Sequence, residues 1–305
     1  FNADLHDLSV YQYNQYSLMS KRIFSGIQPT GIIHLGNYFG AIYNWLELQK
    51  EYDSIFSIVD LHALTVHQDP KKLNRNIYDL AKIYIASGLD PKKNIVFRQS
   101  DVKEHVELGW FLNCVTPIAE LERMTQYKDK SEQHKQNVNS GLFTYPCLMA
   151  ADILLYDTNV VPVGEDQVAH VEFTREVARR FNFIYGREAD FEEKAEAAVT
   201  KMGKKQSKLY RALRKSYQET GDDESLVKAK ALLGEQQNIT LGDRERLLGY
   251  AEGLGKIILT EPEALLTKAS KMPGLDGQKM SKSYNNMISL REEPEAVKQK
   301  INRMP

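Results

Sequence analysis

The fold is decided by the stretch Gly26-Ile27-Gln28-Pro29-Thr30-Gly31-Ile32-Ile33-His34-Leu35-Gly36-Asn37. An apolar run before it predicts a strand, and apolar residues at helical spacing after it predict a helix that begins at about Asn37. Gly26, Gly31 and Gly36 allow positive φ angles and a close approach of the backbone to a ligand. His34 adds a donor that need not be charged, and the helix N-terminus attracts anions. The stretch therefore predicts a phosphate-binding turn, with an ordinary strand-to-helix turn as the alternative.

A second stretch that opens with glycine, Gly277-Gln278-Lys279-Met280-Ser281-Lys282-Ser283, lies far downstream. Together the two stretches resemble the two signatures of class I aminoacyl-tRNA synthetases. The residues His34 to Asn37 stand for the first signature, usually His-Ile-Gly-His, and Asn37 replaces its second histidine. The residues Lys279 to Ser283 match the second signature letter for letter.

Two further stretches resemble the tryptophanyl enzymes in particular. They are Met149-Ala150-Ala151-Asp152-Ile153-Leu154-Leu155-Tyr156 and Val161-Pro162-Val163-Gly164-Glu165-Asp166-Gln167. The resemblance to bacterial and mitochondrial-type tryptophanyl-tRNA synthetases runs from Arg22 to about Gly186 and resumes at about Met272. It implies a tryptophan–tRNA ligase, which forms tryptophanyl-adenylate and pyrophosphate from L-tryptophan and ATP. The enzyme then transfers tryptophan to the 3′ end of tRNA(Trp).

Short apolar runs alternate with helical patterns in residues 21–187, which indicates βαβ units. The patterns predict strands at 54–59, 95–98 and 159–163, and helices at 36–52, 69–87, 104–114, 118–130, 141–158 and 165–182. We therefore predict an α/β fold, a Rossmann-like parallel sheet with helices on both faces, as the resemblance also implies. Ligands bind beyond the carboxyl ends of the strands in such a sheet. His34 and Asp60-Leu61-His62 are expected at such ends.

The remaining segments differ in character from this catalytic domain. Residues 1–20 carry no signal-peptide pattern and are expected to be a poorly ordered leader. Residues 188–260 are charged and helix-prone, which predicts an inserted helical subdomain. Residues 261–288 return to the catalytic domain, with a last helix starting at Glu261-Pro262. Residues 289–305 are expected to begin a truncated anticodon-binding helical domain, so tRNA charging by this chain should be poor.

The composition sets limits on function. The 305 residues carry a formal net charge of −1 and are 42% hydrophobic, so the chain has a real core and no overall basic field for nucleic acid. Cys114 and Cys147 form no zinc pattern, and no metal site is expected. A reducing cytoplasm fits this cysteine usage, and no apolar run approaches the ~20 residues of a membrane span.

A local run at 201–215 holds seven basic residues and no acidic one. It could contact tRNA phosphates, although a solvated helix face is the favoured interpretation.

The resemblance assigns the phosphate chemistry to lysines and to the first turn. The reaction needs in-line positioning and stabilisation of charge on the phosphates, and it needs no protein nucleophile. ATP is a substrate, and Mg²⁺ is expected to arrive on its phosphates. The residues expected to act in catalysis are Lys279, Lys282, Lys130, His34 and Asn37. The residues expected to bind ATP are Gln28, Pro29, Thr30, Gly36, Asn37, Gly164, Glu165, Asp166, Lys271, Lys279, Met280, Ser281, Lys282 and Ser283.

Asp152 is the candidate for tryptophan specificity. An indole N–H is only a donor and needs an acceptor, and a carboxylate on an apolar helix face would otherwise be a costly buried charge. A solvent-facing aspartate is the alternative. The residues expected to surround the ring are Tyr145, Met149, Gln167, Val161, Val163 and His62, although His62 is as readily explained as a core histidine.

Other functions share parts of this pattern. A tyrosyl-tRNA synthetase has the same fold and reaction but must bind a phenol hydroxyl. A nucleotidyltransferase for small molecules shares the first signature without the full lysine loop, and a non-catalytic paralogue would lose matched positions. The resemblance also implies a homodimer, in which Trp110, Phe111, Leu112 and Pro117 belong either to the interface or to the core.

Overall fold

The computed structural model describes residues 21–124, 139–267, 273–278, 280, 284 and 286–302, and the structural statements below concern these residues. The chain divides into two compact units. One unit comprises the residues up to Thr174 and from Pro262 onward, and the other comprises Arg175–Glu261. The second unit thus includes the last part of helix α10 (Val168–Tyr185) as well as residues 188–260. The segment predicted as a leader, residues 1–20, lies outside the described residues.

The first unit contains a five-stranded sheet in which every pairing is parallel. Its strands are β1 (Arg22–Ile27), β2 (Asp53–Ile58), β3 (Ile95–Arg98), β4 (Val160–Val163) and β5 (Glu263–Leu266). The strand order is β3-β2-β1-β4-β5, so the direction of chain progression reverses between β1 and β4. This order confirms the predicted Rossmann-like sheet, and it places the ligand crevice beyond the carboxyl ends of β1 and β4.

One predicted element is wrong. The segment that starts at Glu261-Pro262 was expected to be helical, yet Glu263–Leu266 forms β5 at the edge of the sheet. It pairs in register with β4, from Val160 opposite Glu263 to Val163 opposite Leu266. The local preference of Glu-Ala-Leu-Leu for a helix is overridden because pairing with a buried strand satisfies its backbone groups.

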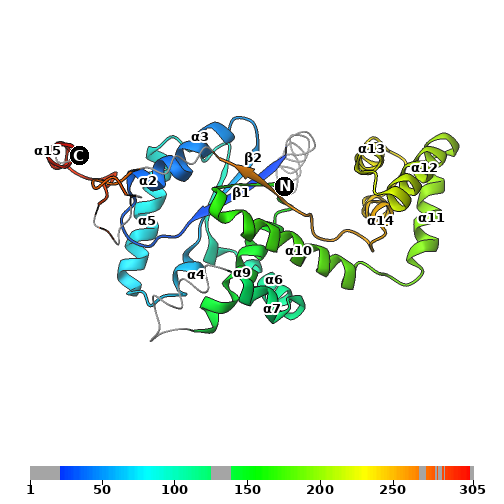
Figure 1. Cartoon of the computed structure of the whole chain (residues 1–305), viewed down its shortest axis with the longest axis horizontal. Coiled ribbons are helices and arrows are strands. Elements are labelled where there is room, and N and C mark those ends of the chain that lie inside the picture. The colour runs from blue at the N-terminus through cyan, green and yellow to red at the C-terminus, as the bar shows by residue number, and fades with distance from the viewer. Residues whose placement is uncertain are drawn as a thin grey trace, which may run out of the picture. The chain divides into compact units, whose positions relative to one another are not determined.

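Helices cover both faces of this sheet, as Figure 1 shows. The helical elements are α2 (Leu35–Asn37), a π-helical turn (Tyr38–Ile42), α3 (Tyr43–Leu48), α4 (Asp60–Ala63), α5 (Pro70–Ala86), α6 (Glu104–Val115), α7 (Ile118–Arg123), α9 (Ser140–Leu154) and α15 (Pro294–Ile301). Two 3₁₀ turns, Gln99–Asp101 and Glu165–Gln167, follow β3 and β4. Helix α9 ends four residues before the predicted Thr158, because Asp157 takes a left-handed φ of 51°.

Neighbouring strand residues point to opposite faces and join separate hydrophobic clusters. Ile23 and Phe56 pack in a cluster with Trp45 of α3 and Tyr84 of α5. A second cluster comprises Phe24, Ile55, Ile153, Val161 and Val171, with α9 and α10 supplying the helical members. The sheet is therefore buried on both sides, as the continuous apolar runs of its strands predict.

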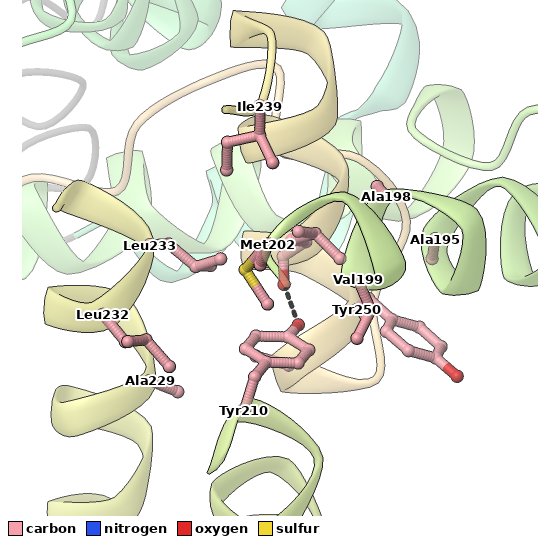
Figure 2. Close-up of a cluster of buried hydrophobic side chains, with 12 residues drawn as sticks. Ala195, Ala198, Val199, Met202, Tyr210, Ala229, Leu232, Leu233, Ile239 and Tyr250 are labelled. Carbon is pink, nitrogen blue, oxygen red and sulfur yellow. Dashed lines mark hydrogen bonds between the residues drawn. The ribbon is translucent and has the colours of Figure 1, made fainter. Parts of the chain in front are cut away.

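The second unit is helical in the part that the structure describes. Its helices are α11 (Phe191–Lys201), α12 (Lys204–Thr220), α13 (Asp223–Gly234) and α14 (Leu241–Glu252). Their apolar faces form a single cluster around Tyr210, which is fully buried (Figure 2). The Tyr210 hydroxyl donates to the carbonyl oxygen of Leu247, so the polar end of this side chain is satisfied inside the cluster. The unit therefore has a hydrophobic core of its own.

Gly249→Ala should destabilise this helical unit strongly. A Cβ at Gly249 would lie 1.5 Å from the carbonyl oxygen of Gly255, and backbone atoms cannot yield as a flexible side chain can. We expect a loss of about 3 kcal/mol in the free energy of unfolding, measured with urea. Gly242→Ala in the same helix is the control, because nothing lies within 4 Å of its added Cβ. Equal stability of the two variants would contradict this close backbone approach.

No helix in the described ranges is both long enough and apolar enough to span a bilayer.

Candidate active site

The segments that leave β1 and β4 lie next to each other at the carboxyl edge of the sheet. Gln28, Pro29 and Thr30 follow β1, while Gly164 to Asp166 follow β4. The two strands are neighbours, paired at Ile23 opposite Val160. Two sets of residues predicted to bind ATP are thereby brought to the position where the strand order reverses, which is where an open α/β sheet binds nucleotides.

The three glycines of the first turn have different roles. Gly31 alone among them takes a left-handed φ, of 79°. A Cβ at Gly26 would lie 2.8 Å from Cγ1 of Val59, so the missing side chain permits close packing of β1 against the end of β2. A Cβ at Gly36 would lie 3.0 Å from the ring of His34. The general expectation of positive φ therefore holds only for Gly31.

The helix after this turn begins earlier than predicted, at Leu35, with His34 as its N-cap residue. The amide oxygen of Asn37 accepts from the backbone N–H of His34 at 3.1 Å, which closes the first turn. His34 is buried, with 7% of its surface exposed. The helical stretch continues through the π-helical turn into α3.

The segment after the lysine loop pairs with this first turn. Leu35 N–H donates to the carbonyl of Ile288 at 3.0 Å, and Leu290 N–H donates to the carbonyl of Ile33 at 3.0 Å. Met280 is buried, and its Cβ lies 3.6 Å from the position that a Cβ on Gly36 would occupy. The two signature stretches, far apart in the sequence, therefore meet in the fold. The predicted site residues Lys130, Lys271, Lys279, Ser281, Lys282 and Ser283 lie outside the described residues.

Hydrogen bonds and an ion pair hold the residues that flank positions 279–285. Leu275 N–H donates to the carbonyl of Asn286 at 2.9 Å, and the Asn286 amide donates to Asp276 at 2.7 Å. Arg291 pairs with Asp79 of α5 at 2.6 Å. Residues 286–291, which follow this interval, are thus held to the sheet unit by both backbone pairing and charge.

Asp152 lies at the centre of a buried hydrogen-bond network, which we call the Asp152 network. Its Oδ2 accepts from His62 Nε2 at 2.7 Å, and its Oδ1 accepts from His105 Nδ1 at 2.6 Å. The amide nitrogen of Gln99 lies 2.7 Å from Oδ1 and 2.9 Å from Oδ2. The second ring nitrogen of His105 bonds to the hydroxyl of Tyr156 at 2.8 Å. Four elements (α4, the turn after β3, α6 and α9) thus converge on one carboxylate.

The environment keeps this carboxylate ionised. Burial by itself raises the pKa of Asp152, but the electrostatic interactions and hydrogen bonds with His62 and His105 outweigh it and lower that pKa below its ordinary value of 3.8. A carboxylate whose pKa is lower in the folded state than in the unfolded state stabilises the fold at any pH above its pKa in the unfolded state. That contribution is lost as the pH falls through the folded pKa, so acid below about pH 3.8 should loosen the network.

Three members of the network, Gln99, His105 and Tyr156, were not predicted from the sequence. Gln99 follows directly after β3, and a polar residue at the carboxyl end of a parallel strand indicates a candidate site residue. Tyr156 lies four residues beyond Asp152. His105 gave no signal, because a histidine in the first turn of a helix is usually a surface residue.

The other residues predicted to surround an indole fall into two groups. Tyr145 and Met149 share the Asp152 face of α9, and the His62 ring lies 6.4 Å from the Tyr145 ring at 80°. Val161 belongs to the cluster beside α9, and Met149 and Val163 pack against it. Gln167 lies apart from these contacts, in the turn after β4, where its amide donates to Asp166.

Tyr145 also bonds to a residue that the sequence did not single out. Its hydroxyl lies 3.0 Å from Nε2 of His170, which is buried on α10. Burial raises the pKa of Tyr145 to about 12, so its hydroxyl stays protonated at neutral pH. The site thus combines an ionised acceptor, several hydrogen-bond donors and an apolar wall.

A fold and site of this kind define a class of enzymes that activate a carboxylate with ATP. The family model for class I tRNA synthetases of the W and Y type matches residues 19–210 and 235–305, and the chain belongs to this family. Residues 211–234 fall outside the match and comprise the end of α12 and helix α13.

Several proteins similar to the chain are tryptophan enzymes. The chain is 51% identical to a tryptophan–tRNA ligase of Ralstonia nicotianae over 94% of this chain and 73% of the relative. It is 57% identical to the corresponding ligase of Wolinella succinogenes over 55% of this chain and 52% of that protein. The crystal structure of tryptophanyl-tRNA synthetase from Campylobacter jejuni, complexed with ADP and tryptophan, is 32% identical with a TM-score of 0.64. That similarity covers 93% of this chain and 67% of the other.

Proposed function

We propose that the chain carries the activity of a tryptophan–tRNA ligase, in which L-tryptophan reacts with ATP and is then transferred to tRNA(Trp). The observation that carries the proposal is the buried, ionised Asp152 on α9, whose partners His62 and Gln99 follow β2 and β3 at the carboxyl ends of these strands. The curated relatives support tryptophan as the amino acid, and the aligned region spans 73% and 52% of their lengths.

The first step is a displacement at phosphorus. A carboxylate oxygen of tryptophan forms a bond to the α-phosphorus of ATP, and the bond from that phosphorus to the bridging oxygen breaks. Pyrophosphate leaves with the electron pair. The segments after β1 and β4 would hold the nucleotide. Lys130, Lys279 and Lys282 would stabilise the charge on the phosphates, with Mg²⁺ carried in on ATP.

Asp152 would accept the indole N–H. A carboxylate offers about four acceptor positions, and all are used in the Asp152 network. Gln99 occupies two of them with a single amide nitrogen. An indole N–H can therefore replace one Gln99 contact while the other persists, and no buried donor is left unpaired. Tyr145, Met149, Val161, Val163, Gln167 and His62 would line the ring and the amino acid backbone.

Exchange of pyrophosphate into ATP, measured with each amino acid in turn, tests this function. We expect exchange with tryptophan and much weaker exchange with tyrosine. Exchange that depends on tyrosine would instead support a tyrosyl enzyme, and exchange with no amino acid would indicate a non-catalytic paralogue.

We propose that the active species is a homodimer that works in the cytoplasm. Helices α6 and α7 expose large apolar side chains, with Trp110 68%, Ile118 66% and Phe111 58% accessible. Trp110 also lines a pocket of about 310 Å³ between α4, α6 and α9. Leu112 is fully buried and belongs to the core instead. Such an exposed apolar surface is typical of an interface. Sedimentation of the Trp110→Ser variant as a monomer would support this assignment.

The tRNA contact is proposed to use part of the basic run. Four of its seven residues have partners: Lys201 pairs with Asp243, Arg211 with Glu196 and Lys215 with Glu219, while Arg214 lies over the Tyr250 ring. The other three, Lys204, Lys205 and Lys208, are exposed, and no carboxylate of the described ranges lies within 4 Å of them. They are available for phosphates.

Replacing Lys204, Lys205 and Lys208 together with alanine should lower the affinity for tRNA. It should also make this affinity depend less steeply on salt concentration. If each lysine neutralises one phosphate, the slope of log affinity against log salt should fall by about 2–3. The control removes Lys228 and Lys230, which are already paired with Glu224 and Glu252. An unchanged slope in the triple variant would assign the run to a solvated helix face.

A further inference from the structure

In the part of the chain that the structure describes, the inner part of the Asp152 network forms no hydrogen bond or ring contact with the other residues proposed to surround tryptophan, apart from the shared Asp152 carboxylate. His105 is fully buried, bonds to Asp152 and Tyr156, and stacks on Phe97 with ring centroids 5.7 Å apart. His62, in contrast, bonds to the other carboxylate oxygen and also lies beside the Tyr145 ring. The hydrogen bonds of His105 therefore lead to the proposed tryptophan site through Asp152.

The contacts of His105 determine which ring nitrogen carries hydrogen. An ionised carboxylate only accepts, so Nδ1 of His105 must carry the hydrogen that it donates to Asp152. The tautomer with hydrogen on Nδ1 leaves Nε2 as an acceptor, and the Tyr156 hydroxyl, 2.8 Å from Nε2, can donate to it. Tyr156 is itself positioned by stacking on Phe24, with ring centroids 5.8 Å apart at 10°. The hydroxyl thus selects the tautomer that the carboxylate needs.

The rotation of the carboxylate is determined in the same way. His105 binds Oδ1 and His62 binds Oδ2, from α6 and α4 respectively. Removing the donor on Oδ1 would leave Gln99 as its sole partner among the described residues, and Gln99 is shared with Oδ2. The Asp152 carboxylate could then rotate about its Cβ–Cγ bond, and its orientation toward an indole N–H would be lost.

We propose that His105, held in one tautomer by Tyr156, is a positioning residue that directs Asp152 toward the indole N–H and so contributes to selection of tryptophan. This inference rests on the proposed function, because it assumes that Asp152 receives the indole. It assigns a role to two residues that do not contact the substrate.

The test uses tryptophan and its benzothiophene analogue, in which sulfur replaces the indole N–H. The measured quantity is the dissociation constant of the analogue divided by that of tryptophan, both determined by calorimetry on the full chain. This ratio reports the contact between Asp152 and the indole N–H. His105→Leu should reduce this ratio about tenfold, which is the effect of one hydrogen bond to a charged group. His105→Asn keeps a donor close to Nδ1 and should restore most of the ratio. The Michaelis constant for ATP should stay unchanged in both variants.

Tyr156→Phe provides a second variant in case His105→Leu fails to fold, because it keeps the ring that stacks on Phe24. We expect it to lower the ratio about threefold, through loss of the tautomer control that a neutral hydrogen bond provides. Unchanged ratios in the folded variants would overturn the positioning role and leave the proposed function intact. A parent chain that activates tryptophan but does not distinguish the analogue would overturn both the indole contact and this inference. A parent without tryptophan activation would overturn the proposed function itself.

Discussion

Replacing Asp152 with alanine should raise the Michaelis constant for tryptophan about ten- to 150-fold in pyrophosphate exchange, and should erode discrimination against amino acids without an indole. The range corresponds to a charged hydrogen bond of about 1.5–3 kcal/mol. A site built to pair a polar group rejects analogues that leave this group unpaired. The Michaelis constant for ATP should change little, because the nucleotide lies beside β1 and β4 in our proposal.

The same substitution should also lower the stability of the sheet unit. Asp152 is 2% exposed, and its removal leaves Gln99, His62 and His105 without their common acceptor. We expect a loss of about 3 kcal/mol in the free energy of unfolding. Asp101→Ala is the control, since that carboxylate is exposed and pairs only at the surface with Arg98. Unchanged tryptophan affinity in a folded Asp152→Ala protein would exclude Asp152 as the indole acceptor.

Replacing Lys282 with alanine should slow the formation of tryptophanyl-adenylate about 10²–10³-fold while leaving tryptophan affinity nearly unchanged. The lysine is proposed to act on charge that develops as pyrophosphate leaves, so its loss affects the transition state more than the ground state. The measurement is a pre-steady-state rate of adenylate formation with saturating tryptophan and ATP.

Two matched variants make this result specific to the lysine in the second signature. Lys282→Arg keeps the charge and should retain part of the rate. Lys71→Ala removes an exposed lysine of α5 and should have no effect. If Lys282→Ala forms adenylate as fast as the parent chain, Lys282 has no part in the chemical step.

The elements of the sheet unit could be predicted because their signals are local. Each central strand is a short apolar run, and α5 begins where Asp69 precedes Pro70. In the structure the Asp69 carboxylate indeed accepts from the N–H of Lys72 at 2.8 Å. Such caps and periodicities act over a few residues, so they are visible without knowledge of the partners. The family, and with it the candidate lysines, followed from two short motifs.

The edge strand and the roles of the glycines could not be predicted in this way. Glu263–Leu266 has a composition that favours a helix. It forms β5 because the backbone of β4 provides hydrogen-bond partners for it. A Cβ on Gly36 would lie in tight contact with the ring of His34, at 3.0 Å, and beside Met280 from a distant segment. Long-range partners decide both outcomes, and local propensity is too weak to oppose them.

The sequence by itself predicted a carboxylate on the apolar face of α9 that, if buried, would need a partner, with a solvent-facing aspartate as the alternative. Only the tertiary structure decided which donors these are. His105, Gln99 and His62 lie 47, 53 and 90 positions from Asp152 along the chain. The order of the parallel strands and the packing of α6 against α9 bring them together. A buried charge requires compensation wherever it occurs, but hydrogen bonds act over about 3 Å, so their partners depend on the three-dimensional arrangement of the chain.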